Sequence, residues 1–368
     1  MTHVRLAAGF LALALLPATP VFAQDPSAAP SATAGPTEDL VDVIAFGSCL
    51  FEEDPQVIWK AVTPVEPDVF VFLGDNIYGD PEDRAILQGK YDTLAANEGF
   101  QSLRASDAEV IAIWDDHDYG QDDAGSEFPM KVESKEVFLD FWGETADSER
   151  RVRDGGVYTS YLYGAEGQRI QIILPDLRWD RSPIDAVTAE EYAARIALDG
   201  GGPYLPTTGD GAQMLGAEQW AWLEAQLREP ADLRIIGVSV PFLQDGTGWE
   251  TWANFPDERE KLIGLIDETG ANGVVFITGD THWAQFSKRT DGVPYALWEV
   301  NSAGLTENWE PVPGDKNRVG ETYSRDNFGL IRVDWSQKDP ELSMEIRDVD
   351  GALVMQESVH LSELRPAG

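Results

Sequence analysis

The stretch DVFVFLGDNIYGD, residues 68–80, joins an apolar run directly to an acidic loop. The run DVFVFL is rich in β-branched and aromatic residues and lacks polar alternation, which is typical of a strand buried on both faces. Asp75 follows this run closely, and Tyr78 lies three residues further along the chain. Because open α/β sheets bind ligands beyond the carboxyl ends of their strands, this carboxylate and phenol indicate a ligand site.

Similar runs along the chain predict further strands. Near-continuous apolar runs predict buried strands in residues 41–47, 68–74, 109–115, 169–176, 233–239 and 273–280. Alternating runs predict half-exposed strands in residues 156–164, 295–302, 329–335 and 342–348.

Helical patterns lie between the strands, in residues 54–62, 216–229 and 256–270. In the first, Asp54 is expected to cap a helix that has Pro55 at its first position. The third has acidic residues in its first turn and closes at Gly270. Strands and helices alternate early and strands crowd late, which predicts an α/β fold of two mixed sheets packed face to face, with helices outside.

The N-terminal sequence predicts export. Residues 1–23 combine the basic Arg5, the apolar run LAAGFLALALL and the cleavage-site pattern VFA before Gln24, as a secretory signal peptide does. A membrane anchor is the alternative, but the apolar run is too short to span a bilayer comfortably. Residues 24–38 are small, polar and Pro-rich, which predicts a flexible linker. We therefore expect a single domain in residues 39–368 and a periplasmic or secreted protein.

Composition excludes some partners. The formal net charge of −38 disfavours nucleic-acid polymers and anionic membranes, and no other segment is apolar enough for membrane insertion. Cys49 is the only cysteine, so it cannot form an internal disulfide. It is either an inert buried thiol or a functional ligand. The sequence does not indicate an oligomeric state.

Several predicted strands end in side chains that bind metals: Cys49, Asp75, Tyr78, Asp115, Asp116, His117, Asp280 and His282. Each aspartate alone could be a turn former. Together they predict a metal site at one edge of the sheets. A thiolate, a phenolate and an imidazole suit a transition ion, Fe(III) in particular, whereas carboxylates suit Ca²⁺ or Mg²⁺. Two unlike ions bridged by Asp75 satisfy both donor types.

These motifs resemble those of the PhoD-like alkaline phosphatases, within the calcineurin-like metallophosphoesterase superfamily. The matching segments lie between about residues 41 and 335 and read AFGSC, FLGDNIYGD, WDDHDYGQDDAG, LPDLRW, ANFPDERE, ITGDTHWAQ, NSAGLT and NFGLIRVDW. The resemblance implies the metallophosphoesterase fold, a four-layer α/β/β/α sandwich. It also implies phosphoester hydrolysis at a dinuclear Fe(III)–Ca²⁺ site, with Mg²⁺, Mn²⁺ or Zn²⁺ as possible substitutes.

The resemblance further implies a distribution of ligands. Iron is expected to bind Cys49, Tyr78 and His282, with Asp75 as the bridge. The calcium side is expected to use Asp280 and the DDH segment at 115–117. Family members often carry Asn at the position of Asp122, and a carboxylate there is expected to bind a divalent ion more tightly but to repel an incoming phosphate.

The expected mechanism uses a metal-bound hydroxide as nucleophile, without a covalent enzyme intermediate. His117 is the candidate to steady the phosphoryl oxygens or protonate the leaving group; alternatively it only orients neighbouring carboxylates. Adjacent aspartates on an extended backbone point in opposite directions, and Asp116 is preferred over Asp115 as the ligand. Arg178 is expected either to bind the phosphate or to pair with Asp176.

The most direct function is therefore a secreted alkaline phosphatase that acts on small phosphomonoesters, with phosphodiesters as a second substrate class. A phosphodiesterase or phospholipase-type enzyme could use the same site. A non-catalytic secreted calcium-binding protein is an alternative of another class, since acidic loops such as GQDDAGSE would suffice for it.

Overall fold

A computed structural model describes residues 37, 39–80 and 82–366. The predicted signal peptide lies outside the described residues, and so does the predicted linker apart from Thr37. Thr37 forms an isolated parallel bridge with Tyr163, so this end of the predicted linker is attached to the domain. No helix in the described ranges combines the length and the apolar character needed to cross a bilayer.

The first sheet has six strands in the order β13-β12-β11-β1-β2-β3. Its strands are β1 (Val43–Gly47), β2 (Val69–Leu73), β3 (Glu109–Ile113), β11 (Asn327–Asp334), β12 (Glu341–Asp348) and β13 (Leu353–His360). Strands β1, β2 and β3 are parallel neighbours, with Ala45 opposite Phe70 and Phe70 opposite Val110. Their carboxyl ends therefore share one edge.

The second sheet has seven strands in the order β10-β8-β9-β7-β6-β5-β4. Its strands are β4 (Thr159–Tyr163), β5 (Ile170–Leu174), β6 (Leu233–Val238), β7 (Val274–Thr278), β8 (Ala284–Arg289), β9 (Leu297–Ser302) and β10 (Arg318–Tyr323). Strands β5, β6, β7 and β9 run parallel, and β4, β8 and β10 are antiparallel to their neighbours. Both sheets are thus mixed.

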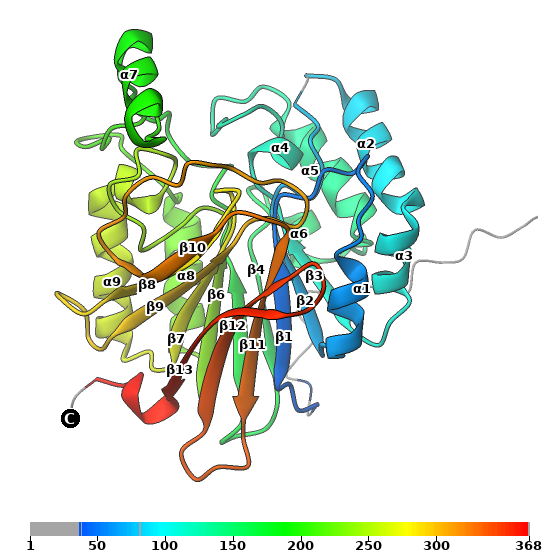
Figure 1. Cartoon of the computed structure of the whole chain (residues 1–368), viewed down its shortest axis with the longest axis vertical. Helices are drawn as coiled ribbons and strands as arrows, with labels where there is room; N and C mark the ends of the chain where they lie inside the picture. Colours follow the sequence, from blue (N-terminus) through cyan, green and yellow to red (C-terminus); the bar gives the residue numbers. More distant parts are fainter. Residues whose placement is uncertain (1–36, 38, 81, 367–368) are drawn as a thin grey trace, which may run out of the picture.

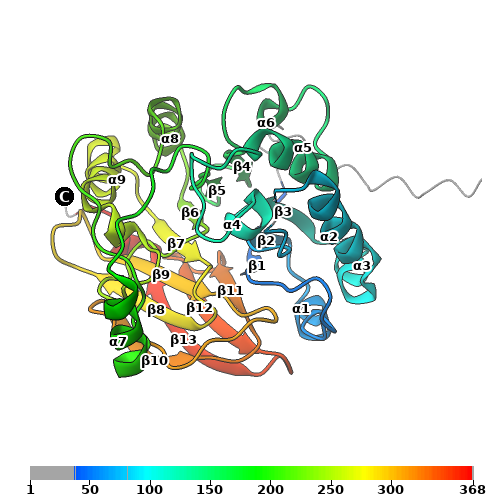
Figure 2. The same ribbon diagram turned by 90° about the horizontal axis from the view of Figure 1, so that it is seen from above.

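Helices cover the outer faces of the two sheets. They are α1 (Trp59–Val62), α2 (Arg84–Ala96), α3 (Glu98–Arg104), α4 (Asp116–Tyr119), α5 (Lys131–Phe141), α6 (Glu149–Val152), α7 (Ala189–Asp199), α8 (Ala217–Arg228) and α9 (Pro256–Thr269). Figure 2 shows α1, α2, α3 and α5 on one outer side of the strands and α8 and α9 on the other. The predicted four-layer α/β/β/α sandwich is confirmed. Helix α7 stands above the rest of the fold in Figure 1.

The core explains why the apolar runs form strands. Every residue of β2, β5 and β7 is buried, so these strands contact neighbours on both faces. Burial of this apolar surface is the main driving force for such a fold. The helix predicted for 256–270 is confirmed, with Gly270 in the left-handed conformation at its end.

Other expectations need correction. The helix predicted for 54–62 begins only at Trp59, because the preceding residues form turns, and Asp54 is not its cap. Strands β8, β10 and β13 were not predicted, since polar residues interrupt their sequences and their pairing is fixed by neighbouring strands. His360 is the last residue of β13.

Candidate metal centre

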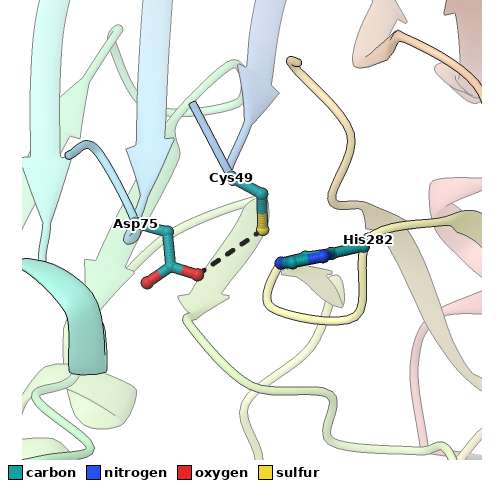
Figure 3. A group of neighbouring side chains, drawn as sticks. All are labelled: Cys49, Asp75 and His282. Carbon is teal, nitrogen blue, oxygen red and sulfur yellow. Dashed lines mark hydrogen bonds between the residues drawn. The ribbon is translucent and has the colours of Figure 1, made fainter. Parts of the chain in front are cut away.

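The candidate ligands converge where strands of both sheets end. Cys49 follows β1, Asp75 follows β2, Asp116 follows β3, and Asp280 and His282 follow β7. One potential ligand atom from each of Cys49, Asp75 and His282 lies within 4.8 Å of the others. Figure 3 shows Cys49 and Asp75 projecting from neighbouring strand ends and the His282 ring approaching from a separate loop. Segments more than 200 residues apart in sequence thus meet at one point.

The backbone is strained where these side chains leave it. Cys49, Asp75, Asp280 and His282 all have positive φ angles, of 60°, 48°, 71° and 63°. Such angles are uncommon for residues with a Cβ atom and cost about 1–3 kcal/mol each. Only six non-glycine residues in the described chain have this conformation, and four are candidate ligands. The tertiary structure therefore holds these side chains in directions that an unstrained backbone would not give.

Asp118 joins the loops after β2 and β3. Its carboxylate accepts hydrogen bonds from the backbone N–H groups of Asp75 at 3.1 Å and of Asp115 at 2.7 Å. Gly74 permits this close approach, because a Cβ there would lie 2.3 Å from the Asp115 Cβ. The two acidic loops consequently form one unit. Sequence analysis missed Asp118, although it belongs to the same DDHD motif.

The thiol, phenol and imidazole side chains form one side of the centre. The Cys49 Sγ lies 3.6 Å from Asp75 Oδ2, and the Tyr78 hydroxyl lies 3.3 Å from His282 Nε2. Cys49 is fully buried, and Tyr78 and His282 are half-buried. A thiol, a phenol, an imidazole and a carboxylate are therefore adjacent, as a transition-metal site requires.

Carboxylates form the other side. Potential ligand atoms of Asp75, Asp115, Asp116 and Asp280 lie within 4.8 Å of one another, and a third group joins Asp75 and Asp116 to His117. Asp75 belongs to all three groups. Asp75 Oδ1 and Asp115 Oδ2 are buried and have no hydrogen-bond partner among the described residues. Since an unpartnered buried carboxylate oxygen is costly, these atoms fit a bound cation.

Arg178 lies behind these carboxylates and is fully buried. Its guanidinium donates to Asp115 at 2.5 Å and to Glu250 at 2.8 Å, and its Nη2 lies 3.3 Å from Asp116 Oδ1. Arg181 Nε lies 3.1 Å from the other oxygen of Glu250. We call Arg178, Arg181, Asp115 and Glu250 the arginine cluster.

Both expectations for Arg178 are therefore wrong. Its guanidinium has no exposed surface with which to bind a phosphate. It does not pair with Asp176 either: Asp176 accepts from the backbone N–H groups of Arg178 and Trp179, while the guanidinium bonds elsewhere. Asp115 belongs to the carboxylate group alongside Asp116, so the preference for Asp116 as the ligand stays a prediction. Glu250 was not predicted, since no motif marks it in the sequence.

His117 lies at the wall of the site, oriented by a second carboxylate. Its Nδ1 is 2.5 Å from Asp80 Oδ1, and its Nε2 is 3.8 Å from both Asp116 Oδ2 and Asp122 Oδ1. The Tyr78 ring lies 4.4 Å from the His117 ring, centre to centre. Asp80 thus fixes the imidazole with its second nitrogen toward the acidic residues.

Asp122 lies in the same cavity as the other predicted ligands but outside the three ligand groups. Its side chain is 78% exposed, and it belongs to none of the three groups. The adjacent Asp123 lies deeper: its backbone N–H donates to Asp116 Oδ2 at 2.7 Å, and its carboxylate accepts from the Tyr204 hydroxyl. Asp122 therefore lies at the edge of the site. Asp123 was overlooked because the motif offers two consecutive aspartates.

The pKa shifts at the metal centre reflect an excess of negative charge. Burial, with the neighbouring Asp75, raises the pKa of the Cys49 thiol well above its usual value. Burial likewise raises the pKa of Asp75 and Asp280, together with repulsion from Asp116 and Asp115 respectively. A cation bound among these groups would reverse this balance, because it favours their ionised forms.

The two histidines differ in charge. Burial lowers the pKa of His282 to about 4, so its imidazole is neutral, the form that binds metals. Burial also opposes the charge on His117, but Asp116, Asp75 and Asp80 raise its pKa to about 11. The surrounding carboxylates therefore favour the protonated form of His117, whereas the neutral His282 is a ligand candidate.

The site opens into a cavity of about 210 Å³, which we call the inner pocket. Its lining includes Asp75, Asp116, His117, Asp280 and His282. Three tryptophans, Trp249, Trp283 and Trp309, complete its walls.

Comparisons with known proteins agree with this geometry. The family model for PhoD-like phosphatases matches residues 44–328, a range that contains every candidate ligand. Alkaline phosphatase D of Bacillus subtilis (strain 168) is 24% identical over 281 residues, which cover 65% of this chain and 46% of that protein. The chain thus spans about half the length of the curated relative it matches.

Solved structures show the same fold. The structure of PhoD superimposes with a TM-score of 0.65 at 15% identity, covering 91% of this chain and 73% of the other. GAP50, described as the anchor in the inner membrane complex of Plasmodium, gives a TM-score of 0.54 at 10% identity and covers 90% of each chain. At these identities the likeness concerns the fold alone.

Proposed function

Because the chain belongs to the PhoD-like phosphatase family, we propose that it is a metal-dependent phosphoric ester hydrolase that works at the inner pocket. We further propose that its substrates are small phosphomonoesters, and diesters where both alcohol groups fit. The curated relative named alkaline phosphatase D supports this reaction class.

We propose that the site holds a transition ion and a hard divalent ion. Cys49, Tyr78 and His282 would bind the first, Fe(III) by donor type, and Asp116 and Asp280 would bind the second, Ca²⁺ by donor type. Asp75 would bind both. When bound, the ions neutralise ester oxygens and lower the pKa of a coordinated water.

One observation carries the proposal: Asp75 belongs to all three potential ligand groups and keeps a buried oxygen without a partner. A carboxylate in that position costs stability unless a cation satisfies it. A purely structural aspartate would instead have its oxygens saturated by N–H groups, as those of Asp118 are.

The protein's own groups supply the proton chemistry. The carboxylates around His117 favour its protonated form, and His117 lines the inner pocket, so it can donate a proton to the departing alkoxide. Asp80 holds its ring, and Asp116 lies against its other nitrogen. Asp116 in turn is held by Arg178 and by the Asp123 N–H. These contacts fix the acid before substrate arrives.

We propose that the protein is exported by its N-terminal signal and loads its metals afterwards. Amino-terminal sequencing of the protein recovered outside the cytoplasm tests this directly. A mature end at Gln24 is expected, and retention of residues 1–23 would contradict export by a cleaved signal.

Elemental analysis and hydrolysis assays test the reaction. The purified protein is expected to contain iron and a divalent ion, to absorb visible light by phenolate-to-iron charge transfer, and to hydrolyse 4-nitrophenyl phosphate. The Tyr78→Phe protein should lose the absorption band. A metal-containing parent protein that hydrolyses neither the monoester nor bis(4-nitrophenyl) phosphate would refute the proposal.

A further inference from the structure

A second cavity adjoins the inner pocket. It has a volume of about 440 Å³, and we call it the outer pocket. Its lining includes Arg195, Tyr204, Leu205, Trp249, Ala253 and Lys316. This volume falls within the range of about 300–1,000 Å³ that is usual for small-molecule sites. The inner pocket, at about 210 Å³, is smaller than that range.

The two cavities share a wall. Trp249 lines both, Glu250 lines the inner pocket, and Thr251 lines the outer pocket. Tyr204, which lines the outer pocket, donates its hydroxyl proton to Asp123 of the inner pocket. The two cavities are therefore neighbours on either side of the Trp249 side chain.

The outer pocket is built by closely packed backbone. The N–H groups of Gly202 and Tyr204 donate to Thr247 and Gly248 carbonyls at 3.1 and 2.8 Å. A Cβ on Gly202 would lie 2.4 Å from the Gly248 oxygen, so only glycine allows this approach. Helix α7 adds Leu198, which is 83% exposed, to the open side. A cavity with fixed walls is preorganised for a ligand.

The two cationic side chains that line the outer pocket already have acidic partners. Arg195 lies 2.9 Å from Glu191, and Lys316 lies 2.8 Å from Asp245. Neither cation is left for a second phosphate. The remaining lining includes Leu205, Ala253 and the indole of Trp249, which suit a neutral ring.

We propose that the outer pocket is the leaving-group subsite and that the preferred substrates are phosphoesters of neutral, ring-containing alcohols or phenols. This inference rests on the proposed hydrolase function. The phosphoryl group occupies the inner pocket, and the ring packs against Trp249 in the outer pocket. Hydrolysis breaks the P–O bond, water supplies the new oxygen on phosphorus, and the alkoxide gains a proton.

Two substrates of nearly equal leaving-group acidity, phenyl phosphate and 2-naphthyl phosphate, test the subsite. Because both esters undergo the same chemical step, the effect of that step cancels in the ratio of their kcat/KM values. Two variants fill the pocket from separate walls, Ala253→Phe and Leu205→Trp. Val152→Trp, at a residue 67% exposed and outside both pockets, is the matched control.

The parent protein is expected to prefer 2-naphthyl phosphate. Each filling variant should lower the naphthyl-to-phenyl ratio about tenfold, the scale of a blocked apolar contact, mainly through KM. The control should keep the parent ratio. A parent protein that hydrolyses both esters while both filling variants keep its ratio would overturn the subsite but leave the hydrolase function standing. A metal-containing parent protein that hydrolyses neither of these esters nor bis(4-nitrophenyl) phosphate would overturn the hydrolase function itself.

Discussion

Two buried, highly charged regions lie side by side in this protein, and they solve the burial of charge in opposite ways. In the arginine cluster, two guanidinium groups meet two carboxylates at distances of 2.5–3.1 Å. At the metal centre, Asp75 and Asp280 have no Lys or Arg partner within ion-pair distance in the described chain. The first region is neutralised largely by the protein's own charges, although Asp115, which both regions share, keeps one oxygen without a partner. Asp75 and Asp280 in the second region need cations instead. A buried carboxylate therefore indicates function when its partner is missing, not merely when it is buried.

The largest effect is expected from a substitution at the metal centre. Asp75→Asn removes the only group shared by all three ligand sets, and we expect loss of both metals. Since bound ions supply several kcal/mol of transition-state stabilisation, kcat/KM should fall at least about 10³-fold. The measurements are elemental analysis and hydrolysis of 4-nitrophenyl phosphate.

The exposed Asp92 on α2 provides the control, because Asp92→Asn removes the same charge far from the metal centre. That variant should retain metals and activity. Full metal content in Asp75→Asn would contradict the bridging role.

The next effect concerns the proton donor between the two regions. His117→Gln keeps a polar side chain but cannot donate an acidic proton, so kcat should fall about 10²–10⁴-fold with metal content unchanged. Asp80→Asn, which loosens the ring, should have a smaller effect in the same direction. His360→Gln, at the end of β13, is the matched control. If His117→Gln also lost metal, His117 would be a ligand rather than the acid.

A third experiment disrupts the arginine cluster. Arg178→Met leaves Asp115 buried without its guanidinium partner and Glu250 with Arg181 alone, and we expect the free energy of unfolding to fall by about 3–5 kcal/mol. Denaturant unfolding measures this change.

The surface pair of Arg84 and Glu136 is the comparison for Arg178. Arg84→Met should change the free energy of unfolding by about 0–1 kcal/mol, because water screens exposed pairs. Equal effects of the two substitutions would show that burial does not distinguish them.

The smallest expected effect is at the edge of the site. Asp122 is largely exposed and outside the ligand groups, so Asp122→Asn should change kcat/KM and metal content by no more than about threefold. A loss of the divalent ion would restore Asp122 as a ligand.

Much of this could be predicted from the sequence, for physical reasons. Uninterrupted apolar runs rich in β-branched and aromatic residues, such as 69–73, favour buried strands, and parallel strands place their following residues at one edge. The proximity of Cys49 and Asp75 follows from that rule, whereas His282 comes from the second sheet.

The rest depends on contacts that leave no local pattern. Glu250 and Arg178 meet across 72 residues, and nothing in either motif specifies that pairing. Strand β10 alternates weakly because it lies at the edge of its sheet. Which of Asp122 and Asp123 points into the site depends on the direction of the loop backbone. Two adjacent aspartates in a sequence do not reveal that direction.

Asp118 has a consequence for how the protein acquires its metals. Its carboxylate already binds the backbone of both acidic loops, and Leu50 N–H donates to the Asp75 carbonyl at 2.8 Å. The loops are thus assembled by the polypeptide itself, so little conformational entropy is lost when ions arrive. The amide protons of Asp75, Asn76 and Asp115 should accordingly exchange slowly with deuterated solvent even after chelation. The metal ions would then bind to a preformed site, and the loops would not need to fold around them.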